Sequence, residues 1–144
     1  MPDPSEIFCS RRGKPEAAVK TDKTMLGDRG EERTARYLES IGYEILERNY
    51  RCRGGEIDIV AREGDDLVFV EVKSRRNTNS GFPSEAVDSR KQRKLIIAGR
   101  QFLIDRDLGE VSCRFDIAEV FFRDAEPVSV NMIKGAFADD SAWG

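Results

Sequence analysis

The apolar positions of this chain recur with two different periods, and the change of period separates helices from strands. Residues 23–41 repeat at helical spacing and are followed by Gly42, a typical helix C-cap residue. The inward stripe of this predicted helix consists of Ala35, Leu38 and Ile41. Residues 84–106 show the same spacing, and their inward stripe consists of Leu95, Ala98 and Phe102. Two helices are therefore expected.

Shorter apolar or alternating runs predict strands. The predicted strands are residues 43–51, 55–62, 66–74 and 113–122, with a weaker edge strand at 127–133. A loop with Gly81 and Pro83 precedes the second helix, and residues 134–144 are expected to form a short helix or a tail. This order predicts an α/β fold: a mixed β-sheet with an antiparallel three-strand meander, a parallel strand after the second helix, and helices on both faces.

The composition fits one globular domain, since 39% of the 144 residues are hydrophobic and 35% are charged. We expect this domain at residues 23–138, after a disordered N-terminal extension at 1–22 and before a C-terminal tail at 139–144. The chain has neither a long apolar run nor the apolar core of a signal peptide, which predicts a cytoplasmic protein without a membrane segment. The widely spaced cysteines, Cys9, Cys52 and Cys113, are expected to be free thiols.

Charge and the lack of histidine limit the available chemistry. The sequence contains no histidine, so this chain alone cannot supply an imidazole base or a Cys/His zinc site. The formal net charge of -3 does not indicate nucleic-acid binding by itself, but basic residues concentrate between Lys73 and Arg106. The small size and acidic charge favour an accessory protein or a homodimer over a processive enzyme. Any catalysis must use carboxylates, lysine and a metal ion.

The predicted hairpin at 55–74 carries charge where a half-buried strand would be apolar. A turn centred between Gly64 and Asp65 pairs residues whose numbers sum to 129. The charged face then pairs Asp58 with Glu71 and Glu56 with Lys73. The opposite face pairs Ile57 with Val72, Ile59 with Val70, and Ala61 with Val68. Like charges paired directly across a ladder are destabilising, so the two carboxylates need compensation.

Two interpretations of this charged face are open. It either points into water, with Glu56 and Lys73 as an ion pair, or it is partly covered. The next pair on the same face, Val60 with Phe69, is apolar, which favours partial cover and a cation between the carboxylates. Oxygen ligands without histidine or paired cysteines favour Mg²⁺ or Mn²⁺. Lys73 emerges two residues after Glu71 on the same face, where it can orient water or stabilise charge on a phosphate.

Glu31 is a candidate for the same site from the first helix. It shares the inward stripe with Ala35 and Leu38, at i, i+4 and i+7, and could hold a metal directly or through water. Asp28 and Glu31 also fit a capping box if the helix begins there, and the residue pattern alone favours the cap.

Basic residues near the hairpin and on the second helix are candidates for nucleic-acid binding. They are Arg75, Arg76, Arg90, Lys91, Arg93 and Lys94. Taken alone, this patch is equally a solvated helix face. Lys91 shares a stripe with Leu95, so it either reaches the site or extends its charged end to solvent. Glu56 is expected to position Lys73, and Arg114 is expected to form a structural ion pair with Asp116.

Five sequence blocks, in order, carry a family resemblance. They are "GEERTARYL", "GYEILERNYR", "GGEIDIVARE", "LVFVEVKSR" and "RFDIAEV". Over about residues 23–138 they resemble the YraN-type family of predicted bacterial endonucleases, distantly similar to archaeal Holliday junction resolvases and part of the restriction-endonuclease-like PD-(D/E)XK superfamily. The resemblance implies a nuclease-like domain whose site residues are Asp58, Glu71, Lys73 and Glu31, with the three acids as ligands of Mg²⁺ or Mn²⁺. Ile57 stands where the motif has proline.

Two functions from different classes are open. The first is a metal-dependent endonuclease that hydrolyses phosphodiester bonds of DNA, including branched or junction DNA. The second is a catalytically inactive module on the same fold that binds nucleic acid or a partner protein. The combination of Asp58, Glu71 and Lys73 favours the nuclease, because a domain without catalysis has no evident need to bring these charges together.

Overall fold

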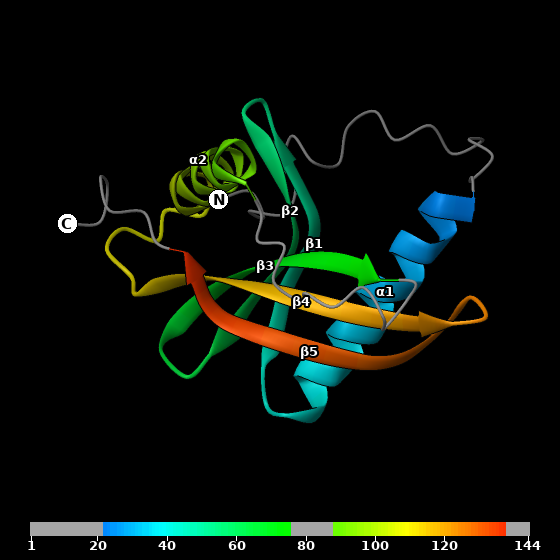
Figure 1. The fold of residues 1–144 in the computed structure, drawn as a ribbon. Coiled ribbons are helices and arrows are strands. Elements are labelled where there is room, and N and C mark those ends of the chain that lie inside the picture. The colour runs from blue at the N-terminus through cyan, green and yellow to red at the C-terminus, as the bar shows by residue number, and fades with distance from the viewer. Residues whose placement is uncertain (1–21, 76–87, 138–144) are drawn as a thin grey trace.

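The computed structural model describes the backbone of residues 22–75 and 88–137, and side chains from residue 27 onward within these ranges. In chain order the elements are α1 (Asp22–Ser40), β1 (Glu44–Cys52), β2 (Gly55–Glu63), β3 (Asp66–Arg75), α2 (Ser89–Asp105), β4 (Cys113–Arg123) and β5 (Glu126–Phe137) (Figure 1). The predicted helices and strands are confirmed within these ranges. The expected N-terminal extension, the loop with Gly81 and Pro83, Cys9, Arg76 and the tail at 139–144 lie outside the described residues, apart from Asp22.

The five strands form one mixed sheet in the order β1-β2-β3-β4-β5. The pairs β1–β2 and β2–β3 are antiparallel. Helix α2 then returns the chain so that β4 runs parallel to β3, and β5 closes the sheet as an antiparallel edge strand. The predicted return of a parallel strand after the second helix is confirmed. The fold is therefore a mixed α/β fold with a mostly antiparallel sheet.

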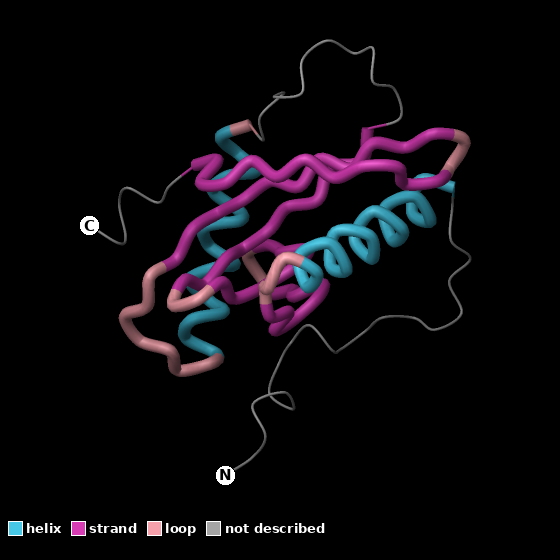
Figure 2. The backbone as a smooth tube through the Cα atoms, turned by 90° about the horizontal axis from the view of Figure 1, so that it is seen from below, coloured by secondary structure: helices cyan, strands magenta, loops and turns pink. Residues whose placement is uncertain are grey.

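The two helices cover different faces of this sheet (Figure 2). On one face, α2 packs Leu95, Ala98 and Phe102 against aromatic side chains of β3 and β4. On the other face, α1 packs Ala35 and Leu38 against valines of β3 and the alanine of β4. The hydrophobic core is thus split into two clusters by the sheet, as the alternation along the strands predicts.

Three expectations about individual segments are corrected. Residues 134–137 continue β5 as a strand, although the sequence favoured a helix or a tail. Ile41 is 46% exposed because α1 ends at Ser40, where Gly42 has a φ of 99° and the chain turns toward β1. Ile57 packs with the α2 cluster, whereas Ile59 packs with the α1 cluster, so the strict alternation of β2 is interrupted at Asp58.

The expected ion pair between Arg114 and Asp116 is confirmed, with Arg114 Nε 3.2 Å from Asp116 Oδ1. Arg114 also binds Glu63, Asp66 and the Tyr43 hydroxyl, so it joins the hairpin turn to β4. Cys52 and Cys113 are free thiols, as expected. Neither helix in the described part of the chain has the length and apolar composition needed to cross a bilayer.

Candidate functional site

The β2–β3 hairpin is paired along only part of its length. Its ladder runs from Glu63–Asp66 to Ile59–Val70 in the predicted register and ends there. Beyond this point β2 remains paired to β1, and β3 remains paired to β4. We call residues 55–58 of β2 and 71–75 of β3 the open end of the hairpin. The charged residues of the hairpin that the sequence singled out all lie at this open end.

Asp58 fills the position at which the two strands separate. Its Oδ2 accepts a hydrogen bond of 2.8 Å from the backbone N–H of Val72, which replaces a ladder bond with a side-chain bond. On β1, Asn49 lies between the partners of Ile57 and Ile59 and has a φ of 55°, an uncommon value for a residue other than glycine. The backbones of β1 and β2 are thus both irregular at Asp58. As a result, Asp58 and Glu71 do not form the direct cross-strand pair that the sequence predicts.

Glu71 approaches Asp58 from the α2 side of the sheet. Its side chain shares this face with Phe69, and the residue is only 7% exposed. Burial raises the pKa of Glu71 to about 8, the neighbouring Asp58 adds to this, and Lys91 opposes it. Lys91 Nζ lies 3.2 Å from Glu71 Oε2, yet no well-aligned hydrogen bond reaches that buried oxygen from the described residues. Of the two interpretations of Lys91, the structure supports the one in which it reaches the site.

Glu31 approaches Asp58 from the opposite side, on α1. Burial raises the pKa of Glu31 to about 7, with Asp58 as the next cause, while Arg48 and a hydrogen bond with Asn49 lower it. Glu31 Oε1 is buried and has no hydrogen-bond partner among the described residues. Helix α1 begins at Asp22, well before Asp28, so Glu31 lies within the helix and the capping-box interpretation was wrong.

Asp58 is therefore the common electrostatic neighbour of two acids that come from opposite faces of the sheet, the buried Glu71 and the half-buried Glu31. Two carboxylate oxygens, Glu31 Oε1 and Glu71 Oε2, are buried and accept no hydrogen bond from the described residues, although Lys91 Nζ lies 3.2 Å from Glu71 Oε2. Such oxygens are hard donors of the type that Mg²⁺ and Mn²⁺ prefer. Within the described ranges, however, no three Asp, Glu or Cys side chains are grouped closely enough to form a ready-made metal cage. The donor chemistry fits a divalent cation with one or two carboxylates, whose remaining ligands would be water or substrate.

Lys73 lies on the α2 face of β3, in register with Glu119 of β4. Among the described residues it makes no hydrogen bond or ion pair. Glu56 was expected to position Lys73, but the structure pairs Glu56 with Arg51 at 3.3 Å across β1–β2. The reason is the separation of the strands, since Glu56 and Lys73 lie beyond the end of the β2–β3 ladder.

The predicted basic patch divides into residues with different environments. Arg75 Nη2 lies 3.5 Å from Oε2 of Glu119, a fully buried carboxylate, so Arg75 has a structural partner. Arg90, Arg93 and Lys94 are exposed on α2. Among the patch residues that the structure describes, only Lys91 is joined directly to the acidic site. The role of the basic residues in nucleic-acid binding stays a prediction.

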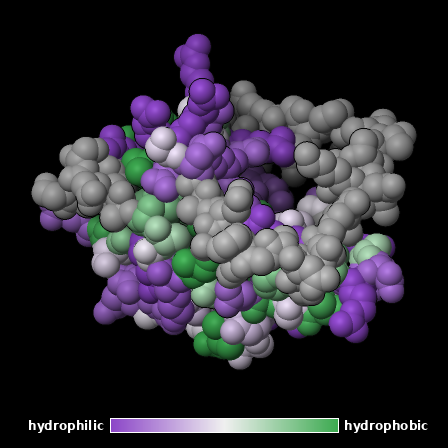
Figure 3. Space-filling view, viewed as in Figure 1, coloured by the Kyte–Doolittle hydropathy of each residue, from purple (hydrophilic) through white to green (hydrophobic). Residues whose placement is uncertain are grey.

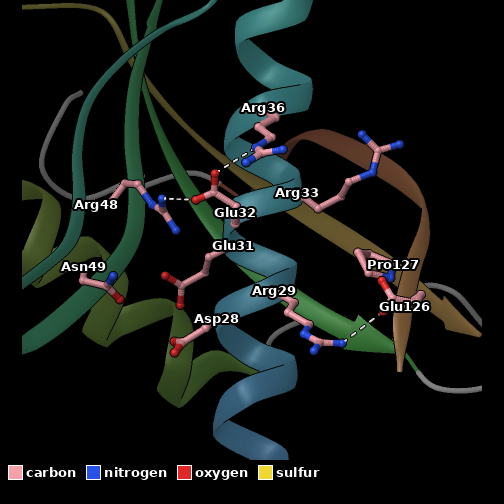
Figure 4. A pocket seen from close by; sticks show the side chains of 10 residues that line it. All are labelled: Asp28, Arg29, Glu31, Glu32, Arg33, Arg36, Arg48, Asn49, Glu126 and Pro127. Carbon is pink, nitrogen blue, oxygen red and sulfur yellow. Dashed lines mark hydrogen bonds and ion pairs between the residues drawn. The ribbon is translucent and has the colours of Figure 1, made fainter. Parts of the chain in front are cut away.

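A cleft of about 700 Å³ lies beside Glu31, between α1, β1 and the start of β5 (Figure 4). Glu31 and Asp28 point toward Asn49 on one side of α1, whereas Arg29 and Arg33 lie on the other side (Figure 4). The cleft is lined by four arginines and four acids: Arg29, Arg33, Arg36, Arg48, Asp28, Glu31, Glu32 and Glu126. Glu32 forms ion pairs with Arg36 and Arg48, and these neutralise part of the charge on the lining of the cleft. This cleft is therefore balanced in charge.

Two residues of the site, Asn49 and Arg48, were not predicted from the sequence, and neither was the buried Glu119 beside it. Asn49 and Arg48 belong to β1, a strand for which the sequence indicated no functional residue. Both lower the pKa of Glu31. Glu119 lies two residues after Ile117 on the same face of β4, but a single acid in an apolar strand gave no indication of its partner. An asparagine inside a predicted strand was the one available signal, because asparagine adopts positive φ more readily than most residues other than glycine.

The fold and the site together define a small mixed-sheet α/β protein with acidic side chains gathered at the open end of a hairpin. Residues 30–120 match the model of the uncharacterised protein family UPF0102. A UPF0102 protein of Caldicellulosiruptor saccharolyticus is 44% identical over 117 residues, which cover 81% of this chain and 99% of the relative. Another, of Moorella thermoacetica, is 47% identical over 112 residues, covering 77% of this chain and 93% of the relative. The chain belongs to the UPF0102 family, which is the YraN-like family that the five sequence blocks resemble.

Proposed function

We propose that this protein is a metal-dependent endonuclease that hydrolyses DNA phosphodiester bonds, including those of branched DNA, on a restriction-endonuclease-like fold. The observation that carries the proposal is the approach of Glu31 and Glu71 to Asp58 from opposite faces of the sheet. The mixed sheet, with β3 antiparallel to β2 and parallel to β4, supports the resemblance to the PD-(D/E)XK superfamily.

The energetic cost of this arrangement supports a role beyond structure. Burial favours the neutral form of a carboxyl group, and the pKa values of Glu31 and Glu71 are raised to about 7 and about 8. Placing two such acids beside Asp58 destabilises the ionised protein near neutral pH. Strongly perturbed acids with a specific charged neighbour are typical of functional sites. A bound cation would remove this penalty.

The residues fit a cation held by Asp58 and Glu71, with Glu31 as a further ligand directly or through water. Bound Mg²⁺ or Mn²⁺ would polarise a phosphate oxygen and increase the acidity of a coordinated water. Aspartate and glutamate oxygens, with water completing the shell, match the coordination preferences of these ions.

Lys73 would act on the reacting phosphate. Its ammonium group makes no hydrogen bond or ion pair with the described residues, although its charge acts on Asp88, and Lys73 lies on the same face as Glu71, two residues away. In hydrolysis, water adds to phosphorus and the P–O bond to the leaving sugar oxygen breaks, giving a phosphate monoester and an alcohol. Negative charge develops on the non-bridging oxygens during this step, and a preorganised ammonium stabilises it.

A second function is favoured by one observation. The described residues contain no ready-made group of three metal ligands, which would suit a module that binds nucleic acid without turnover. The two functions differ in a measurable way, because only the nuclease requires Lys73 and a divalent cation for a covalent change in DNA.

A cleavage panel tests the proposal. Linear duplex, single-stranded, flap and four-way junction DNA are incubated with wild-type protein and Mg²⁺ or Mn²⁺, beside the variant Lys73→Ala. We expect metal-dependent cleavage that falls by about 10²–10³ in Lys73→Ala, with DNA binding within a few-fold of wild type, the scale of losing one preorganised charge stabiliser. Lys134→Ala, which removes a lysine whose side chain is 54% exposed, is the charge-matched control and should cleave like wild type. Absence of cleavage by the wild type, or equal cleavage by Lys73→Ala, would favour the binding module.

A further inference from the structure

We infer that a second, basic pocket beside the acidic site binds a backbone phosphate of the DNA, an inference that rests on the proposed function. The pocket has a volume of about 380 Å³ and lies between the β1–β2 turn and α2. Its charged lining residues are Arg51, Arg53, Lys91, Lys94 and Glu56. Of these, only Lys91 and Lys94 were candidates for nucleic-acid binding on the sequence alone.

The charge of this pocket distinguishes it from the larger cleft beside Glu31. Four cationic side chains line it against one acid, and that acid, Glu56, is ion-paired with Arg51 at 3.3 Å. The larger cleft has as many acids as arginines on its lining. A polyanion is attracted by a local excess of positive charge, so the smaller pocket is the better phosphate site.

Two of the cations are available to a ligand. Arg53 and Lys94 are exposed and make no hydrogen bond or ion pair with other described residues. They come from different elements, the β1–β2 turn and α2, and line the same pocket. An arginine can bind two phosphate oxygens at once, while a lysine contributes a compact charge, so together they suit a phosphodiester group.

Direct backbone packing holds the two walls of the pocket together. A Cβ atom at Gly55 would lie 2.5 Å from the backbone carbonyl oxygen of Lys94, and one at Gly54 would meet the side chain of Ile97. Only glycine allows the turn to approach α2 this closely. The turn that carries Arg53 is therefore fixed against the helix that carries Lys94, which reduces the entropy lost when a ligand orders them.

Lys91 connects this pocket to the acidic site. It lines the pocket, and its Nζ is 3.2 Å from Glu71 Oε2. Hydrophilic side chains gather over the end of the β1–β2 hairpin that lies next to α2 (Figures 1 and 3). A DNA strand with one phosphate in the pocket would thus place a neighbouring phosphate near Glu71 and Lys73.

The test compares salt dependence of DNA binding in two double variants. Arg53→Ala/Lys94→Ala removes the two available cations, and Arg62→Ala/Lys134→Ala removes the same charge from surface side chains that are 57% and 54% exposed. Arg62 lies seven residues from Gly55 along β2, which corresponds to about 23 Å at 3.3 Å per residue. Affinity for a fluorescent DNA duplex is measured in metal-free buffer at several salt concentrations, so that cleavage does not interfere.

We expect the slope of log affinity against log salt to decrease by about 0.9 in Arg53→Ala/Lys94→Ala, because the two side chains bind one phosphate and each phosphate contact on duplex DNA contributes about 0.9. The control variant should keep the wild-type slope. Equal slopes in all three proteins, or no DNA binding by the wild type, would overturn the inference. So would displacement of the duplex by inorganic phosphate at equal phosphate concentration, because the pocket would then be a site for free phosphate.

The same experiment separates the two proposals. Pocket-dependent DNA binding by a wild-type protein that cleaves nothing would contradict the proposed nuclease and support the pocket. Metal-dependent cleavage with equal slopes in the two double variants would support the nuclease and contradict the pocket.

Discussion

The paired end and the open end of the β2–β3 hairpin are built from the same two strands but serve opposite purposes. In the paired end, residues 59–61 and 68–70 are buried apolar side chains joined by a continuous ladder. In the open end, the ladder stops and Asp58 accepts a hydrogen bond from the β3 backbone instead. The paired end stabilises the fold by burying apolar area, whereas the open end gives up regular pairing so that acids from both faces can approach Asp58.

The largest expected effect is at the paired end. Phe69→Ala removes a side chain that packs against Phe102 and Phe115, and it should lower the free energy of unfolding by about 3–5 kcal/mol. Urea unfolding at fixed pH measures the loss. Ile104→Ala, at an apolar residue that is 70% exposed, is the control and should change stability by less than about 0.5 kcal/mol. Similar losses in both variants would mean that the paired end is not the main source of stability.

The next largest effect is expected on the pH dependence of stability, at Glu71 of the open end, two residues after Phe69 on the same face of β3. The pKa of Glu71 is raised from 4.5 to about 8, so the folded protein holds a proton that the unfolded chain has lost between these values. The contribution of Glu71 to stability is therefore present at low pH and is lost as pH rises toward 8. Glu71→Gln should reduce the fall in stability between pH 5 and pH 8 by about 1–3 kcal/mol, measured by urea unfolding in metal-free buffer.

A matched control sharpens this prediction. Asp65→Asn changes an exposed acid in the hairpin turn at the paired end, so it should leave the pH dependence of stability as in the wild type. If Glu71→Gln and Asp65→Asn follow the same curve, Glu71 is not the strained acid that its burial indicates.

The register of the hairpin and both helices could be predicted from the sequence, because each depends on local rules. A two-residue turn at Gly64 and Asp65 fixes the pairing of Ile59 with Val70, and apolar alternation fixes the faces. The stripe of Leu95, Ala98 and Phe102 likewise identified the buried side of α2. The same register predicts that Asp58 and Glu71 lie close together near a covered region. It does not predict that the ladder ends before them or that Asp58 binds the backbone of Val72.

The rest depended on tertiary contacts that no local pattern encodes. The ladder ends after Ile59 because β2 and β3 separate, and the backbone at Asn49 adopts an uncommon φ beside that point. The capping-box interpretation of Glu31 was wrong because it required a helix start at Asp28, whereas α1 begins at Asp22, close to the start at residue 23 that the helical spacing predicts. Arg53 escaped notice because a single arginine in a turn indicates nothing until α2 is packed against it.

The most direct test of the account is whether the acids at the open end bind a divalent cation. Melting temperature is measured at pH 8 with and without Mn²⁺ for the wild type, Asp58→Asn and the control Asp65→Asn. Asparagine at position 58 retains an oxygen that can accept the hydrogen bond from Val72, so the change removes mainly charge. Metal at about ten times its dissociation constant adds about 1.4 kcal/mol of stability, or about 4 °C for a domain of this size. We expect this increase in the wild type and Asp65→Asn and a clearly smaller one in Asp58→Asn. An equal response to metal in all three proteins, or no response in the wild type, would contradict this expectation.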